Sequence, residues 1–153
     1  MRISHRVSLA GLLAVIGLAA GPVFGAPEPA ALPFQVTLPD GVQTIVQQGP
    51  DFTVYYFNKG DRTLAGAYYG FAPMFSPDPS GPPVQQRVTC DGSAVLKREV
   101  LLVVKSGTWT NYVHAWTAQL PEADRPAAEA ILRSIHVNGM NAGIGSGELK
   151  PCP

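Results

Sequence analysis

The alternation of apolar and polar residues between positions 94 and 105 limits the fold of this chain more than any other feature. One side of this segment is apolar and carries Ala94, Leu96, Val100, Leu102 and Val104. The other side is charged and carries Lys97, Glu99 and Lys105. A period of two residues with one apolar side is typical of an antiparallel strand with one face in a core and one in water. We therefore expect an antiparallel sheet.

Further segments of the chain have the composition of strands. Each is rich in β-branched or aromatic residues and is bounded by turn residues; they are residues 34–38, 42–48, 51–58, 63–69, 84–90 and 108–120. Asp91-Gly92 predicts a tight hairpin turn before residue 94. Residues 71–83 hold five prolines and predict a loop, because each proline removes a backbone donor.

The last regular element is predicted to be a helix. Apolar residues recur at the spacing of one helix face, at Ala128, Ile131, Leu132 and Ile135. Asp124 is placed to cap the first turn, and Pro126 is tolerated within it. Strands followed by a helix indicate an α+β fold, so we expect an antiparallel sheet of about five to seven strands with the C-terminal helix packed on one face.

The first 25 residues have the pattern of a secretory signal peptide. Arg2 and Arg6 precede an apolar stretch that runs from residue 7 to about residue 24, and small residues follow. We expect cleavage after Gly25. Because about 18 apolar residues lies at the short end of what spans a bilayer, an uncleaved membrane anchor remains the alternative. The expected product is periplasmic or secreted, without stable membrane insertion after cleavage.

The chain is expected to have four parts. Residues 1–25 are the signal peptide, and residues 26–33, with three prolines, form an extended lead-in. Residues 34–137 form a single α+β domain. Residues 138–153 form a tail rich in glycine and asparagine.

The charge of the exported part argues against nucleic acid as a partner. Loss of Arg2 and Arg6 leaves nine basic residues against eleven acidic ones. A protein that binds nucleic acid needs a basic face to neutralise phosphates. The same near-neutral charge gives no reason to expect an anionic membrane surface as a partner.

The two cysteines, Cys90 and Cys152, are predicted to form a disulfide. Both lie in the exported part, and a lone pair of thiols in an oxidising compartment usually becomes a disulfide. The bond would pin the tail to the turn at Asp91-Gly92. Two free thiols, or a disulfide between two chains, remain open as alternatives.

Two stretches of the sequence resemble the PsbP-like superfamily, which includes PsbP, the Ran-binding Mog proteins and DcrB. The first is Phe34-Gln35-Val36-Thr37-Leu38-Pro39-Asp40-Gly41, and the second is the closing hairpin and helix, which ends Ala128-Glu129-Ala130-Ile131-Leu132-Arg133-Ser134-Ile135. Members of that group usually have a helix where this chain has the proline-rich residues 72–83. The resemblance implies a non-catalytic binding or accessory protein that acts on other proteins. It assigns no functional residue to a position here.

The motifs of the common enzyme classes are absent from the sequence. It contains no Gly-x-Ser-x-Gly, Ser-x-x-Lys or His-Glu-x-x-His, and residues 143–147 follow a helix rather than a strand, unlike a phosphate-binding loop. His114 is the one candidate for acid–base or metal chemistry, with Met74 conceivable as a second ligand for copper. We expect a non-catalytic protein without a cofactor or metal; a small-molecule or metal-binding enzyme that uses His114 is the alternative.

Aromatic and apolar residues crowd the first hairpin and the loop that follows it. They form the candidate interaction surface: Tyr55, Tyr56, Tyr68, Tyr69, Phe71, Met74 and Phe75. Adjacent strand residues point to opposite faces, so one tyrosine of each pair is expected on the outer face. Exposed tyrosines are favoured at protein interfaces; the alternative is that they cover the second face of the sheet against the loop and the tail. The sequence therefore favours an exported periplasmic binding or accessory protein that contacts another envelope protein; it leaves the oligomeric state open.

Overall fold

The computed structural model describes residues 32–106, 108–141 and 152. The predicted signal peptide, the start of the lead-in and most of the predicted tail lie outside these residues. In the described part the chain is mostly strand. The described helices are all too short or too polar to cross a membrane.

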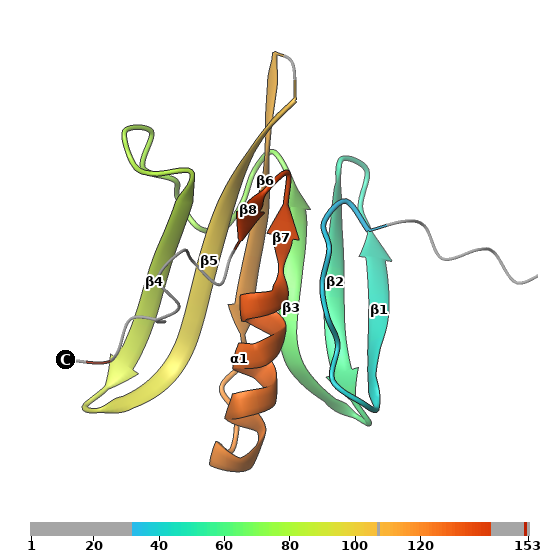
Figure 1. Cartoon of the computed structure of the whole chain (residues 1–153), viewed down its shortest axis with the longest axis vertical. Helices are drawn as coiled ribbons and strands as arrows, with labels where there is room; N and C mark the ends of the chain where they lie inside the picture. The colour runs from blue at the N-terminus through green and yellow to red at the C-terminus, as the bar shows by residue number, and fades with distance from the viewer. Residues whose placement is uncertain (1–31, 107, 142–151, 153) are drawn as a thin grey trace, which may run out of the picture. The chain divides into compact units, whose positions relative to one another are not determined.

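Six strands form one antiparallel sheet within the described residues (Figure 1). They are β1 (Val42–Gln48), β2 (Phe52–Lys59), β3 (Arg62–Gly70), β4 (Val84–Asp91), β5 (Ala94–Ser106) and β6 (Trp109–Thr117). Their order across the sheet is β1-β2-β3-β6-β5-β4. The predicted antiparallel sheet with a C-terminal helix is confirmed. The pairing of β3 with β6, which are distant in the sequence, is the step that joins the two halves of the sheet.

The helix α1 (Arg125–Ser134) follows a single 3₁₀ turn, η1 (Glu122–Asp124). The predicted apolar face is confirmed, because Ala128, Ile131 and Leu132 are buried. Asp124 occupies the N-cap position, but its side chain makes no capping hydrogen bond. It pairs instead with Arg62 of β3. After the helix, β7 (His136–Val137) and β8 (Met140–Asn141) form a short separate hairpin.

The register of the central strands separates two sides of the sheet. Ala67 of β3 lies opposite Ala115 of β6, which lies opposite Val100 of β5. All three belong to the same buried cluster as the apolar residues of α1, and we call this side the core side. Successive side chains of a strand alternate, so the intervening residues lie on the opposite side, here called the outer side: Gly66, Tyr68, Glu99, Leu101, His114 and Trp116.

The prediction of a strand at residues 34–38 is wrong. Only Gln35 makes a bridge, with His136, and the amide of Thr37 donates to Oγ of Ser134. The backbone of this segment is therefore bonded to the chain around the end of α1 and has no adjacent strand along its length. Its apolar residues are still used, because Phe34 is buried in the core.

The prediction that the second side of β5 faces water is wrong for the middle of the strand. Leu101 is fully buried and Glu99 is 7% exposed. Phe75, from the loop between β3 and β4, is also buried, and its ring centroid lies 5.8 Å from that of His114 on the outer side. The proline-rich loop therefore covers the centre of the outer side.

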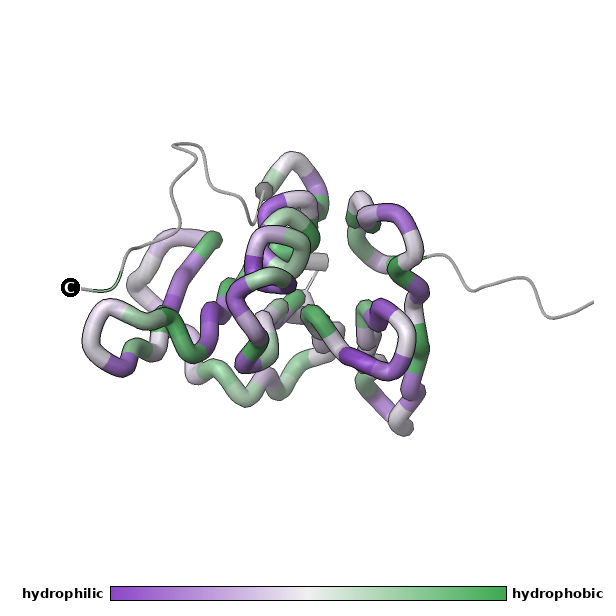
Figure 2. Tube along the Cα trace, turned by 90° about the horizontal axis from the view of Figure 1, so that it is seen from below, coloured by the Kyte–Doolittle hydropathy of each residue, from purple (hydrophilic) through white to green (hydrophobic). Residues whose placement is uncertain are grey.

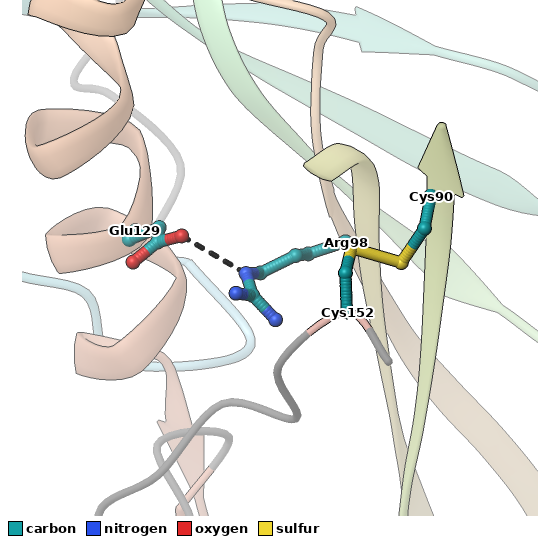
Figure 3. Close-up of a disulfide and its surroundings, with 4 residues drawn as sticks. All are labelled: Cys90, Arg98, Glu129 and Cys152. Atoms are coloured by element: carbon teal, nitrogen blue, oxygen red, sulfur yellow. Dashed lines mark hydrogen bonds and ion pairs between the residues drawn. A yellow bond between two sulfur atoms is a disulfide. The ribbon is translucent and has the colours of Figure 1, made fainter. Parts of the chain in front are cut away.

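The predicted disulfide is confirmed. Cys90, at a bulge in β4, is bonded to Cys152 across 62 residues of sequence. Figure 3 shows the bond beside Arg98 of β5, whose side chain points toward Glu129 on α1. Nε of Arg98 lies 2.9 Å from Oε1 of Glu129. The Cys90–Cys152 disulfide and the Arg98–Glu129 ion pair therefore lie close together at the part of the sheet formed by β4 and β5.

Candidate functional site

The seven residues of the predicted interaction surface do not lie on one face. Tyr55 lies on the core side, is 6% exposed, and meets the Phe34 ring edge-on at 5.2 Å. Tyr69 also points to the core side and packs against the core. Phe75 is buried over His114. Tyr55 and Phe75 are therefore not available to a partner, and Tyr69, which is half-buried, lies on the core side and not on the outer side.

The other two tyrosines of that set lie on the outer side. The ring of Tyr68 stacks on Phe52 of the neighbouring strand at 5.7 Å, and its hydroxyl accepts a hydrogen bond from the amide of Ala72. Tyr56 lies opposite Ile45 of β1 and donates to Oε1 of Gln47 at 3.4 Å. Both rings are half-buried, so part of each remains accessible.

The loop after β3 adds the most exposed apolar side chains. Phe71 is 56% exposed and Met74 is 92% exposed. The segment is held on the outer side at both ends, by the bond from Ala72 to Tyr68 and by the packing of Phe75 on His114. Met74 is therefore presented to solvent from an anchored loop.

Residues that the sequence reasoning missed complete this surface. Ile45, 52% exposed on β1, and Trp116 on β6 lie in one row across the sheet with Tyr56 and Gly66. The alternation within each segment places each residue on a side, but only the strand order places them in one row. We define the outer apolar surface as Ile45, Phe52, Tyr56, Tyr68, Phe71, Met74 and Trp116.

A buried polar cluster lies beside this surface. Nε2 of His114 is 3.1 Å from Oε1 of Glu99, and Nζ of Lys97 is 2.8 Å from the same oxygen. The His114 ring lies between Phe75 and Trp116, 5.3 Å from the latter. Arg87 closes the cluster, because its guanidinium stacks over the Phe75 ring at 4.3 Å, a cation–π contact.

The electrostatics of the cluster indicate which of His114 and Glu99 is charged. Burial lowers the pKa of His114 below its ordinary value, against the opposing effect of Glu99. Burial alone would raise the pKa of Glu99, but the hydrogen bond and charge of Lys97, together with His114, bring it below its ordinary value. Glu99 is therefore ionised and His114 neutral near pH 7, so Nε2–H of His114 donates to the carboxylate.

This arrangement does not favour chemistry at His114. The imidazole is 3% exposed, and one of its nitrogens is occupied by Glu99. Among the described residues there is no group of three or more His, Cys, Asp or Glu side chains that could hold a metal. Met74 is turned to solvent, unlike the buried imidazole. The cluster is best understood as an internal hydrogen bond from neutral His114 of β6 to ionised Glu99 of β5, which fixes the two strands to each other beneath the loop.

A separate groove of about 700 Å³ lies between the proline-rich loop, the β5–β6 hairpin and β8; its walls include Pro77, Gln85, Val103, Tyr112 and Met140. His114 is not part of its lining. Its one carboxylate, Asp78, is engaged by the amide and hydroxyl of Ser80. The other titratable groups of its lining are Lys105 and Tyr112.

Comparison of the chain with protein-family models, with curated proteins and with solved structures found no match.

Proposed function

We propose that this protein is an exported binding or accessory protein of the cell envelope, non-catalytic, that acts through contacts with another protein. One observation carries the proposal: the outer apolar surface exposes Ile45, Phe71 and Met74 by more than half of each side chain. Large apolar groups gathered on one exposed surface mark interaction sites. Half-buried aromatic rings between them match the composition of interface centres.

Export to the periplasm or beyond is part of the same proposal. It is supported by the signal-peptide pattern of residues 1–25 and by the Cys90–Cys152 disulfide, since such bonds persist mainly in oxidising compartments.

We further propose that α1 packs on one face of the sheet and leaves the other face for the partner. The shared buried cluster of α1 and the core side supports this arrangement. Figure 2, which views the strands nearly end-on, supports it as well, because the helix stands to one side of the curved row of strands. The outer side would then be covered only in its centre, by the loop that carries Phe75.

Membership of the PsbP-like superfamily is proposed on the outline of the fold. An early hairpin, later strands and a closing helix are what the resemblance implies, and all are present. The loop between β3 and β4 contains no helix, in contrast to what that group usually has there. An accessory role toward other proteins follows from the resemblance and agrees with the outer apolar surface.

The test is cross-linking and capture of the mature tagged protein from envelope preparations. A Phe71→Ser/Met74→Ser variant removes two exposed apolar groups without touching a buried one, so it should stay folded and lose its partner. Trp109→Ser is the matched control, because Trp109 is also exposed (76%) but lies at the β5–β6 turn. If the double variant captures the same proteins as the unsubstituted chain, the outer apolar surface is not the binding site.

A further inference from the structure

The strand β1 is an edge of the sheet that lacks the usual protection against pairing. Within the part of the chain that the structure describes, it has a strand neighbour on one side only, β2. Its sequence, Val-Gln-Thr-Ile-Val-Gln-Gln, contains no charged residue and no proline. Ile45 and Val46 are 52% and 54% exposed, on opposite sides of the strand. Uncharged, apolar edges of this kind are templates for a further strand.

The opposite edge of the sheet is protected. β4 carries Arg87 and Asp91 and has a bulge between Thr89 and Cys90. Cys90 is in addition bonded to Cys152. Charges and bulges are the devices that keep an edge strand from pairing. The contrast between the two edges indicates that only β1 is open to a further strand.

The hairpin turn reveals which backbone groups of β1 are free. The amide of Gly49 donates to the carbonyl of Phe52 at 2.8 Å, so these two opposed residues form a hydrogen-bonded pair. Bonded and non-bonded pairs alternate along an antiparallel ladder. Thr44 and Val46 therefore fall on non-bonded positions, and their amides and carbonyls point to the open edge.

The amide of Val42 agrees with this alternation. It lies on a non-bonded position by the same count, and it donates to the carbonyl of Pro39 rather than to β2. By the same count the amides and carbonyls of Thr44, Val46 and Gln48 are open, so the open groups include those at the middle of the strand.

We infer that β1 pairs antiparallel with β1 of a second copy of this chain. The strand is self-complementary about Ile45, which would lie opposite its own copy. Thr44 then lies opposite Val46, and Gln43 opposite Gln47. The centre of the pairing is β-branched and apolar, amides flank it, and no like charges are opposed, which is the cross-strand pattern that stabilises antiparallel pairs. Pairing about a two-fold axis makes the same patch serve both copies.

The backbone agrees with this register. Thr44 of one copy and Val46 of the other would form hydrogen-bonded pairs through their open amides and carbonyls. Ile45 would face its copy at a non-bonded position, where opposed side chains come closest. The two-fold axis stands perpendicular to the sheet, so the outer sides of both copies face the same way and the two outer apolar surfaces meet at Ile45.

The oligomeric state of the mature protein tests this inference. Analytical ultracentrifugation should give the mass of two chains for the unsubstituted protein. Ile45→Glu opposes two carboxylates across the axis and should weaken self-association by at least about tenfold. Thr89→Glu places the same charge on the other edge and should leave the dimer intact. A monomeric unsubstituted protein, or a dimer unaffected by Ile45→Glu, would overturn the inference.

Two further kinds of variant test the register. Val46→Pro removes an amide that points to the open edge, so the β1–β2 ladder keeps its bonds and circular dichroism should be unchanged while the dimer is lost. Ile45→Cys should form a cross-linked dimer on oxidation, because residue 45 faces itself. Val46→Cys should not, because residue 46 faces residue 44. A cross-linked dimer of the Val46→Cys variant, together with none of the Ile45→Cys variant, would contradict the register.

Discussion

Trp116 fills the space that the missing side chain of Gly66 leaves on the outer side of the sheet. The two residues lie directly opposite each other on β6 and β3, and a methyl group on Gly66 would come to 2.5 Å from Cζ2 of the indole. The ring lies on the backbone of β3 and extends to His114 on its own strand, 5.3 Å away. This contact joins the outer apolar surface to the buried polar cluster.

Gly66→Ala should therefore displace the indole. We expect a loss of about 1–2 kcal/mol in the free energy of unfolding, because the ring has no free space to enter without leaving its contacts. Tryptophan emission in a Trp109→Phe background isolates Trp116 and should shift to longer wavelength. Unchanged emission and stability would show that the position of the Trp116 ring does not depend on the absence of a side chain at Gly66.

The buried state of His114 should make stability fall in mild acid. Burial lowers the pKa of this imidazole from 6.5 in the folded protein, so below that pH the unfolded chain binds a proton that the folded chain does not. Stability then decreases as pH falls below about 6.5, by up to about 1.4 kcal/mol per pH unit. The lowered pKa of Glu99 adds a second loss below its ordinary value of 4.5.

Urea unfolding of the unsubstituted protein and of His114→Gln, at about pH 7.5 and about pH 5.5, measures this effect. The variant cannot take up the proton, so its stability should change less over this range. An equal change in the free energy of unfolding between the two pH values for both proteins would contradict the protonation assigned to His114.

Loss of the disulfide should destabilise the protein without changing its strand order. The bond closes a loop of 62 residues, and in the chain-entropy account such a closure is worth about 4 kcal/mol. A Cys90→Ser/Cys152→Ser variant should show this loss in urea unfolding. A thiol reductant should reproduce it in the unsubstituted protein and leave the variant unaffected. Equal sensitivity of both proteins to the reductant would contradict the assignment.

The two ion pairs of Glu129 should contribute differently to the free energy of unfolding. Its contact with Arg98 lies between α1 and β5 and is largely buried on the arginine side, whereas its contact with Arg133 is an exposed pair one turn away on the same helix. Glu129→Ala should cost about 1–3 kcal/mol, because it leaves a buried guanidinium with fewer partners. Arg133→Ala should cost less than about 0.5 kcal/mol. Similar losses in urea unfolding would show that burial of Arg98 is not the source of the effect.

The sequence by itself determined the elements whose cause is local. Period-two alternation and turn residues located β1 to β6, the spacing of Ala128, Ile131 and Leu132 located α1, and the count of two cysteines predicted their bond. Each of these depends on neighbours within a few residues or, for Cys90 and Cys152, on having no other partner of their kind in the sequence.

The tertiary structure decided the features that depend on contacts between segments distant in the sequence. Residues 34–38 alternate like a strand, but no adjacent strand pairs along them. Glu99 has the pattern of a solvent-facing residue, yet it is buried on the side that the loop carrying Phe75 covers, and His114 donates a hydrogen bond to its carboxylate. The pairing of β3 with β6 brought Gly66 to Trp116 and assembled the outer apolar surface. These outcomes follow from strand order and from loop placement, which are set by long-range packing that no local pattern encodes.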